Sequence, residues 1–152
     1  MDPITLRQCR AAEIYAAANA AALWAEYAAE SSIPELGPHD PQIPIYQNLE
    51  DAGVMTVFGA FLGDELAGMI TVLISVVPHY GRMIATTESF FVCAKARSSG
   101  AGVKLLKAAE DYARAAGAVA FFVSAPAGGR LERVMPHWGY RESNRVFVRG
   151  LV

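Results

Sequence analysis

Runs of apolar residues with two different periods divide the chain into helices and strands. Residues 4–9 alternate apolar and polar positions, and this period of two predicts a short first strand. Residues 11–29 are rich in alanine and place their apolar side chains on one helical face, which predicts one long helix. Prolines and a glycine between positions 34 and 41 predict an irregular loop. A short helix over residues 44–51 follows, because proline is favoured in the first helical turn.

The middle of the chain predicts an antiparallel meander of three strands. Residues 54–62 and 66–77 are apolar runs on either side of a Gly-Asp-Glu turn, as in a hairpin. A second turn at residues 78–81 leads to a third strand over residues 83–93.

Helices and strands alternate in the last third of the chain. Residues 103–116 predict a helix, and residues 119–124 predict a strand of the apolar kind that is buried on both faces. Residues 130–138 predict a short helix that Pro136 disturbs, and a last strand pair is expected around residues 142–144. This order predicts a single α/β domain with a mixed sheet over residues 1–152.

Composition narrows the class of protein. Of the 152 residues 53% are hydrophobic, but 27 are alanine, so the core is of ordinary size. The net charge of −2 and the scattered Lys and Arg residues argue against a nucleic-acid partner. Cys9 and Cys93 make no disulfide framework, no Cys/His cluster has metal-ligand spacing, and Cys93 lacks a neighbouring base, so no metal and no cysteine nucleophile is expected. No signal-peptide pattern opens the chain and no apolar run reaches the ~20 residues of a membrane span, so we expect a cytoplasmic protein without a membrane partner.

One segment carries the strongest chemical signal. The strand end Glu-Ser-Phe-Phe-Val-Cys, residues 88–93, leads into the run 97–102, Arg-Ser-Ser-Gly-Ala-Gly, and then into a helix. Small residues let backbone amides converge, and the free amides of a first helical turn bind phosphate. The run lacks the Gly-Lys-Ser/Thr of a P-loop, and Leu105 stands where a dinucleotide fingerprint needs a third glycine. A third pattern, Arg97-x-x-Gly100-x-Gly102, is complete.

With this motif and this order of elements, the chain resembles the GNAT superfamily of acyl-CoA-dependent N-acetyltransferases from residue 4 to about residue 148. The resemblance implies an antiparallel meander followed by a splayed strand pair with flanking helices, and acetyl-CoA between the two splayed strands. The pantetheine would pair with the backbone of the third meander strand. The pyrophosphate would lie on the amides at the helix start, with an arginine as a further contact. The cofactor residues so implied are Phe90, Phe91, Val92, Arg97, Ser98, Ser99, Gly100, Ala101 and Gly102.

The resemblance also implies the reaction, which is transfer of an acetyl group to a small-molecule or peptide amine by direct attack. The amine must lose a proton, and Glu88, where similar proteins carry a carboxylate, is the candidate base. Its even offset from Phe90 and Val92 predicts that these three side chains share one strand face; a solvent-facing glutamate is the alternative. The amide of Phe90 or Phe91 is the expected oxyanion donor. The candidate substrate contacts are Thr86, Tyr46 and Tyr80.

The general acid departs from the family pattern. Relatives often have a tyrosine four residues before a Gly-Phe/Tyr pair, but here Met135 precedes Gly139 and its tyrosine. His137, Tyr46 or Tyr80 would then serve as acid, or the thiolate leaves unaided. The missing tyrosine favours an alternative, a catalytically silent acyl-CoA-binding or regulatory domain, and a general phosphate- or nucleotide-binding module is a third hypothesis. The acceptor, the acyl-chain length and the oligomeric state stay open, although many relatives form homodimers.

Overall fold

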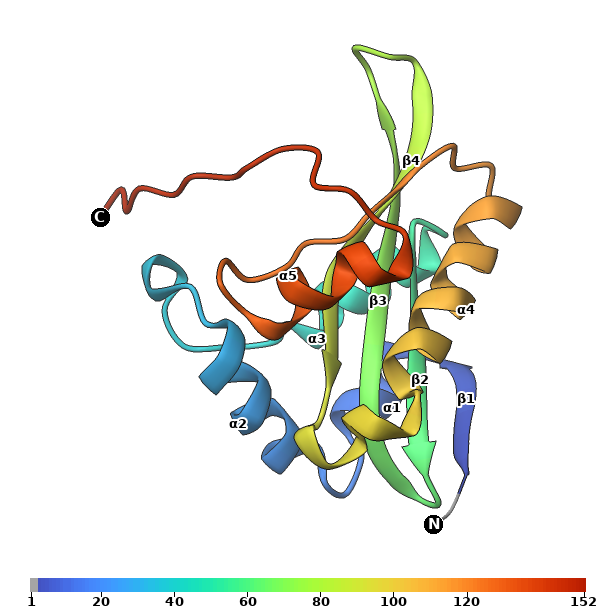
Figure 1. Ribbon diagram of the computed structural model, residues 1–152, viewed down its shortest axis with the longest axis vertical. Helices are drawn as coiled ribbons and strands as arrows, with labels where there is room; N and C mark the ends of the chain where they lie inside the picture. The colour runs from blue at the N-terminus through green and yellow to red at the C-terminus, as the bar shows by residue number, and fades with distance from the viewer. Residues whose placement is uncertain (1–2) are drawn as a thin grey trace.

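In the computed structural model, which describes residues 3–152, five strands form one sheet in the order β1-β2-β3-β4-β5 (Figure 1). The first four strands pair antiparallel, and β5 pairs parallel with β4. The predicted mixed sheet with its meander is therefore confirmed. The strands are β1 (Ile4–Cys9), β2 (Met55–Leu62), β3 (Glu65–Val77), β4 (Arg82–Val92) and β5 (Phe121–Phe122).

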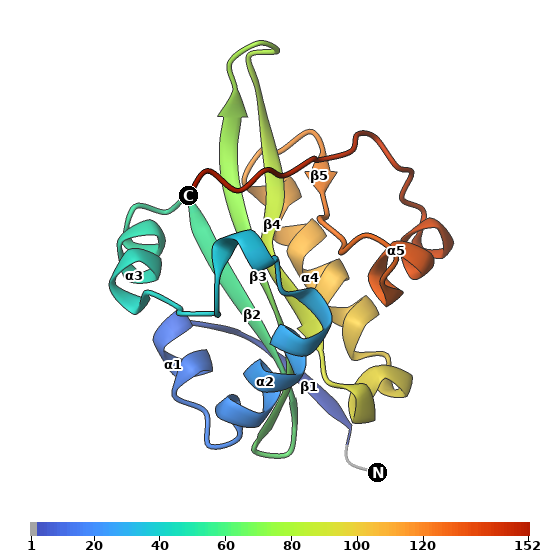
Figure 2. The ribbon, with the colours of Figure 1, turned by 90° about the vertical axis from the view of Figure 1, so that its left-hand side faces the viewer.

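Helices cover both faces of this sheet (Figure 2). One face carries α1 (Ala11–Tyr15), α2 (Ala20–Ser31) and α3 (Ile43–Asp51), and the other carries α4 (Ala101–Ala115) and α5 (Arg130–Val134). Three short 3₁₀ helices complete the fold: η1 (Pro34–Leu36) precedes α3, η2 (Ala94–Ser99) precedes α4, and η3 (Met135–Trp138) follows α5. The largest fully buried side chains come from α1, β2, β3 and α4, and they are Ile14, Val57, Leu66, Met69, Ile70, Val72 and Leu105.

The helix predicted over residues 11–29 is in fact two helices, because the chain breaks before Asn19. The Asn19 Nδ2 donates to the Leu66 carbonyl at 2.8 Å, and its Oδ1 accepts from the Leu66 N–H at 3.1 Å. An amide side chain matches a backbone residue in this way because it offers one acceptor and one donor side by side. The break therefore depends on a residue far away in the sequence, and the alanine run gives no local sign of it.

A charge network around one buried carboxylate holds α3 against the start of α1. The Arg10 guanidinium lies 2.7 Å from Asp51 Oδ1 and 3.4 Å from Glu50 Oε2. The nearly buried Glu50 carboxylate also accepts the Ala11 N–H at 3.2 Å. A buried carboxylate is tolerated because it has both a cationic partner and a hydrogen-bond donor. This network sets the position of α3, and with it the position of Tyr46.

The pairing of β3 with β4 contains one irregularity. Thr71 lies opposite Ser89, but the next residue, Val72, lies opposite Thr87, so Glu88 is the extra residue of a β-bulge. The two strands also approach closely near the end of β4, where Gly68 lies opposite Val92.

The last third of the chain differs from the sequence prediction. The strand predicted over residues 119–124 pairs with β4 at two residues only. The helix predicted from residue 103 begins at Ala101, and η2 precedes it. The strand pair expected around residues 142–144 is wrong, because residues 141–152 form no strand in the described chain. The disturbed helix over residues 130–138 is confirmed and changes to a 3₁₀ helix next to Pro136, which cannot donate a helical hydrogen bond.

The close approach at Gly68 predicts a large effect of a single methyl group. A Cβ at Gly68 would lie 2.6 Å from the Phe91 carbonyl oxygen, and a backbone atom inside a sheet cannot move aside. Gly68→Ala should therefore lower the free energy of unfolding by about 1–3 kcal/mol, as overpacking does, measured by urea denaturation. Gly102→Ala is the control, since its nearest neighbour would lie at 3.4 Å. Equal stability of the two variants would contradict the register of β3 on β4.

Candidate functional site

β4 and β5 separate after a short contact, and this separation forms the candidate site. Ala85 pairs with Phe121 and Thr86 with Phe122. One step further, the Ser124 N–H donates to the side-chain Oγ1 of Thr87 at 3.0 Å. From Glu88 to Val92, β4 has no strand beside it on this edge in the described chain. The predicted splayed strand pair is therefore present, with a bare backbone edge between its arms.

Backbone alternation shows which amides this edge exposes. The Cys93 N–H donates to the Ala67 carbonyl of the neighbouring chain segment at 2.8 Å. Because antiparallel strands alternate their hydrogen bonds, the Phe91 amide two residues earlier also points toward β3. The Phe90 and Val92 amides then point to the bare edge. The sequence left Phe90 and Phe91 open as oxyanion donors, and only Phe90 has the required direction.

The start of α4 lies directly beyond the end of this edge. Gly100 precedes the helix with a φ of +84°, and its carbonyl accepts the first intrahelical bond, from the Lys104 N–H at 3.1 Å. The amides of the first turn precede that bond and so have no partner within the helix. A Cβ at Gly102 would lie 3.4 Å from the Trp138 ring and 3.8 Å from Val92, so this turn adjoins both side chains. The Ala101 N–H donates to the Ser99 hydroxyl at 3.3 Å.

Arg97 lies at the same place but is held by the protein itself. Its Nε donates to the Val92 carbonyl at 3.0 Å, and its guanidinium forms an ion pair with Glu30 of α2. It also lies over the Phe91 ring, 5.5 Å from the centroid. One helical turn earlier in α2, Glu26 accepts the Ala94 N–H at 2.9 Å. Arg97 therefore fastens α2 to the end of β4 in this structure.

Glu88 lies at the other end of the bare edge and is exposed to solvent. Its Oε1 accepts a hydrogen bond from the Tyr46 hydroxyl at 2.7 Å, and that hydroxyl lies 3.4 Å from the Tyr15 hydroxyl. Tyr15 stacks on Trp24 with ring centroids 4.6 Å apart. The carboxylate thus closes a row of aromatic side chains supplied by α1, α2 and α3.

The prediction that Glu88 shares a face with Phe90 and Val92 is wrong. The Val92 side chain faces α4, where it lies beside Gly102. Phe90, two residues earlier in the strand, lies on the same face. Glu88 instead bonds to Tyr46 on the opposite side of the sheet. The bulge is the cause, because one inserted residue reverses the alternation of side chains along the strand.

The tyrosines around Glu88 are held in their protonated form. Burial raises the pKa of Tyr15, Tyr27 and Tyr46, and the negative charge of Glu88 raises each of them further. For Tyr46 the hydrogen bonds to Tyr15 and Glu88 act in the same direction as burial. These hydroxyls therefore remain donors at neutral pH.

Other predicted site residues lie elsewhere or face away. Tyr80 is exposed at the tip of the β3–β4 hairpin, which projects from the body in Figure 1, so the structure does not bring it to Glu88. The His137 Nδ1 lies 3.2 Å from the Arg133 carbonyl of its own helical segment. Met135 is buried. Thr86 pairs with Phe122 at the point where β4 and β5 begin to separate.

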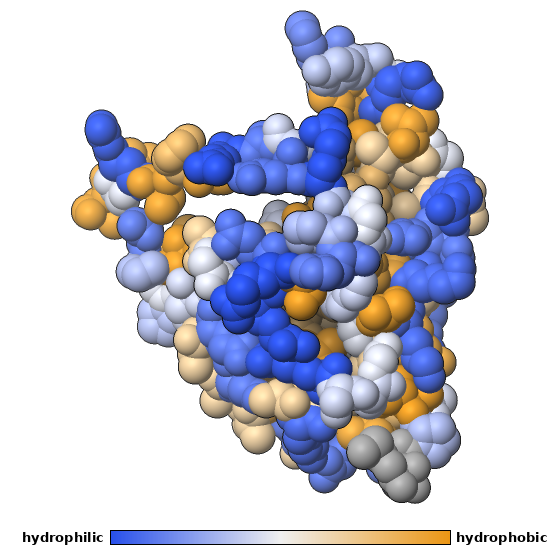
Figure 3. All heavy atoms as spheres, viewed as in Figure 1, coloured by the Kyte–Doolittle hydropathy of each residue, from blue (hydrophilic) through white to orange (hydrophobic). Residues whose placement is uncertain are grey.

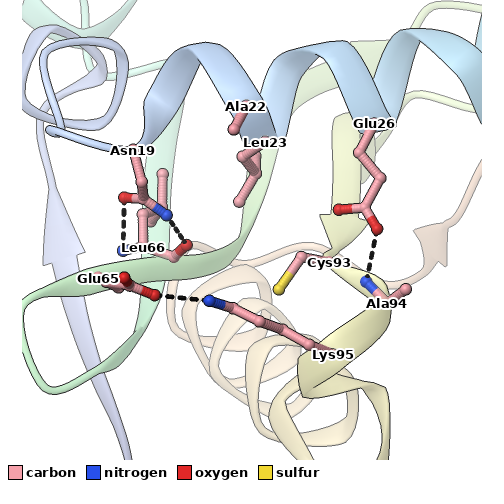
Figure 4. A pocket seen from close by; sticks show the side chains of 9 residues that line it. All are labelled: Asn19, Ala22, Leu23, Glu26, Glu65, Leu66, Cys93, Ala94 and Lys95. Carbon is pink, nitrogen blue, oxygen red and sulfur yellow. Dashed lines mark hydrogen bonds and ion pairs between the residues drawn. The ribbon is translucent and has the colours of Figure 1, made fainter.

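A separate hollow of about 470 Å³ lies between α2 and the ends of β3 and β4 (Figure 4). The Lys95 Nζ lies 2.6 Å from Glu65 Oε2, and Asn19 is bonded to Leu66, so these polar groups are paired. The Cys93 thiol faces this hollow, and burial raises its pKa, which disfavours a thiolate. The residues that line the hollow are Asn19, Ala22, Leu23, Glu26, Glu65, Leu66, Cys93, Ala94 and Lys95.

Sequence reasoning missed two features of the site. Tyr27 stacks on Phe91 with centroids 4.9 Å apart, and the Phe90 amide, which acts on its hydroxyl, offsets part of the pKa rise that burial causes. The second feature is a charge boundary that the sequence does contain. Residues 11–81 hold nine of the fifteen acidic residues and none of the thirteen Lys and Arg residues. The helices on the Glu88 side come from this stretch.

Residues 3–152 contain no group of three or more His, Cys, Asp or Glu side chains placed to hold a metal ion. No described helix is both long enough and apolar enough to cross a membrane.

The raised tyrosine pKa values predict alkaline sensitivity. Above pH ~10 an unfolded chain releases these protons while the folded chain keeps them, so stability falls as pH rises. Each tyrosine contributes at most about 1.4 kcal/mol per pH unit, less where solvent screens the hydroxyl. Tyr46→Phe should flatten the fall in the free energy of unfolding between pH ~10 and ~11, measured by urea denaturation. Tyr80→Phe, at the exposed hairpin tip, should keep the wild-type slope; a wild-type slope in Tyr46→Phe would refute the buried Tyr46 hydroxyl.

Comparisons with solved structures agree with this architecture. An aminoglycoside acetyltransferase from an uncultured soil metagenomic sample, solved in complex with trehalose, matches with a TM-score of 0.75 and 16% identity over 98% of this chain and 97% of that one. A transcriptional regulator from Bacillus halodurans C-125 matches with a TM-score of 0.72 and 17% identity over 96% and 98%. Ribosomal-protein-alanine N-acetyltransferase from Brucella melitensis biovar Abortus 2308 matches with a TM-score of 0.66 and 19% identity over 96% of both chains. At these identities the matches show a shared fold.

Of two comparisons of sequence, one identifies a family. No curated protein sequence matches the chain. The sequence profile described as the Acetyltransferase (GNAT) family matches residues 17–133, which include the splayed strands and the whole of α4. This range covers most of the chain, and the fold and the Arg97-x-x-Gly100-x-Gly102 motif agree with it. The chain therefore belongs to the GNAT family of acetyltransferases.

Proposed function

We propose that this protein transfers an acetyl group from acetyl-CoA to an amine by direct attack of the amine on the thioester. The observation that carries the proposal is the bare edge of β4 between Glu88 and Val92, which has a helix start at one end and a carboxylate at the other. An extended arm with a pyrophosphate at one end and a reactive carbonyl at the other would fit such an edge.

The cofactor would bind as an added strand. Its pantetheine amides would pair with the Phe90 carbonyl and the Val92 amide, which point to the open edge. The pyrophosphate would lie on the first-turn amides of α4, where Ala101 and Gly102 follow the exposed Ser98 and Gly100. Phe91 would contribute through its ring, which packs on α2. Arg97 would contact a phosphate only after leaving Glu30, so we assign it first to holding α2 in place.

The chemistry would need one base and one oxyanion donor. Glu88 would accept the proton of the attacking amine, directly or through water, because an ammonium has no lone pair for the attack. The Phe90 N–H would stabilise the thioester oxygen as it gains charge. Tyr46 would orient the Glu88 carboxylate through its 2.7 Å hydrogen bond, and Tyr27 stands near the Phe90 amide as a donor toward the leaving sulfur.

The acceptor would be a cationic amine. The helices around Glu88 come from residues 11–81, which contain no Lys or Arg. Some acidic residues of this stretch form ion pairs with Arg7, Arg10 and Arg97. Aromatic faces beside a carboxylate attract an ammonium group, which interacts with the negative face of a ring. A small molecule and a peptide would both meet this requirement.

A second function is favoured by Met135, which stands buried where relatives often carry a tyrosine acid. A silent acyl-CoA-binding or regulatory domain would keep the bare edge and the helix start but would release no CoA. Release of CoA from acetyl-CoA with any member of a panel of amines would separate the two functions.

Gly102 provides a test of the cofactor site. Gly102→Val should place a branched side chain over the first-turn amides and weaken acetyl-CoA binding by more than about tenfold, or about 1.4 kcal/mol. Gly102 is a cleaner choice than Gly100, whose positive φ would strain any side chain. Calorimetric titration with acetyl-CoA measures the effect, and Gly102→Ala should fall in between.

The ligand-free melting temperature controls for folding in this test. Wild-type protein should gain about 2.7 kcal/mol of stability at a hundredfold excess of acetyl-CoA over Kd, and adenosine should add none. Unchanged acetyl-CoA affinity in Gly102→Val would rule out the helix start as the phosphate site.

Glu88→Gln tests the base. The variant keeps size and removes charge, so kcat should fall by about 10²–10⁴-fold. The loss should shrink at high pH, where the free amine forms without help. The matched control is Glu110→Gln, because Glu110 also accepts a tyrosine hydroxyl, from Tyr140 at 2.6 Å, but lies on α4. A change in KM alone would instead make Glu88 an anchor for the cation, and wild-type kinetics at every pH would remove it from the site.

A further inference from the structure

The two cations of η2 are each paired with a carboxylate from another part of the chain. The Arg97 guanidinium forms an ion pair with Glu30 of α2, and the Lys95 Nζ lies 2.6 Å from Glu65 Oε2 at the start of β3. Guanidinium and ammonium groups bind carboxylates and phosphates through the same charge-assisted hydrogen bonds. A phosphate that approaches η2 therefore competes with these carboxylates for their cations.

The two cations differ in where they lie. The Arg97 Nε donates to the Val92 carbonyl at 3.0 Å, and Val92 also adjoins the first turn of α4, since a Cβ at Gly102 would lie 3.8 Å from it. Lys95 instead lines the hollow between α2 and the ends of β3 and β4 (Figure 4). Of the two ion pairs, that of Arg97 is the one that adjoins the proposed phosphate site.

An anion from solvent can reach the ion pair between Arg97 and Glu30. The side chains of Arg97 and Glu30 are 20% and 43% exposed. Figure 3 shows mainly hydrophilic surface where α2, α5 and the start of α4 meet. An ion pair that is partly open to solvent is weak, because water screens both charges. A pyrophosphate carries more negative charge than one carboxylate and can therefore displace Glu30.

Displacement of Glu30 frees the C-terminal end of α2. The N-terminal end of this helix is fixed, because Asn19 makes two hydrogen bonds with Leu66. Between the two ends lies the hollow of about 470 Å³, which gives the helix room to move. The other polar contact of α2 with η2, from Glu26 to the Ala94 N–H, lies one helical turn nearer to the fixed end.

We propose that Glu30 is a positioning residue that competes with the cofactor's phosphates for Arg97, so that binding of acetyl-CoA releases the C-terminal end of α2. Release of α2 shifts Tyr27, which stacks on Phe91. When CoA leaves, Arg97 returns to Glu30, and this return favours dissociation of the product. The inference rests on the proposed function, because it takes acetyl-CoA as the ligand.

The first test compares two variants that each free one cation of η2. Glu30→Gln frees Arg97 beside the start of α4, Glu65→Gln frees Lys95 in the hollow, and both change the net charge equally. Calorimetric titration should give about two- to fivefold tighter binding of acetyl-CoA by Glu30→Gln, and wild-type affinity for Glu65→Gln. Acetyl-pantetheine, which has no phosphate, should bind equally to all three proteins. A merely structural Glu30 would lower the melting temperature on substitution without raising the affinity for acetyl-CoA.

The titrations separate this inference from the proposed function. Equal or weaker binding of acetyl-CoA by Glu30→Gln overturns the inference and leaves the proposed function standing. An equal gain in Glu65→Gln, or for acetyl-pantetheine, overturns it as well, because the gain would then not come from Arg97 and a phosphate. A wild type that does not bind acetyl-CoA at ~1 mM removes the proposed function, and the inference with it.

Amide hydrogen exchange tests the release of α2. Saturating acetyl-CoA should speed exchange at residues 26–31 of wild type and slow it in the first turns of α4, because one segment loses contacts while the other gains a ligand. In Glu30→Gln, residues 26–31 should exchange fast before any ligand is added. Unchanged or slower exchange at residues 26–31 of wild type on binding overturns the proposal.

Discussion

A strand that is paired with its neighbour on one edge and, from Glu88 to Val92, lacks a strand on the other is the constraint on which this molecule depends. β4 pairs with β3 along its length, yet from Glu88 to Val92 its outer edge meets no strand in the described chain. Unpaired backbone donors and acceptors that are shielded from water cost folding free energy unless a partner satisfies them. The surrounding elements are arranged around this edge. Arg97 donates to the Val92 carbonyl, the Thr87 hydroxyl accepts the Ser124 N–H, and the Tyr27 hydroxyl lies at the Phe90 amide.

The two faces of the sheet divide the chemistry. On one face, α1, α2 and α3 bring aromatic and acidic side chains toward Glu88, and Arg10 fastens α3 through Glu50 and Asp51. On the other face, α4 turns its first amides toward the end of the bare edge. The ion pair between Arg97 and Glu30 joins the two halves, because it ties α2 to the segment that precedes α4. The position of α2 is thus coupled to the position of the segment that leads into α4.

The fold was largely predictable from local pattern. The meander followed from alternating apolar runs, and α4 followed from an amphipathic run ended by Gly117, because hydrophobic period depends only on neighbouring residues. The break at Asn19 was not predictable, since it depends on hydrogen bonds to Leu66, forty-seven positions away. The strand pair predicted around residues 142–144 is not formed in the described part of the chain, because propensity for a strand does not supply a partner edge.

The sequence by itself determined the family motif and the glycine-bearing run that leads into α4, because these are written in contiguous positions. Only the tertiary structure decided which way each group points. The bulge between Thr87 and Ser89 turned Glu88 toward Tyr46, and a bulge exists only in the register of one strand on another. Arg97 met Glu30 for the same reason, since sixty-seven residues separate them along the chain and the fold brings them into contact. Spacing specifies what a short segment can do, whereas side-chain direction depends on the strands and helices packed against it.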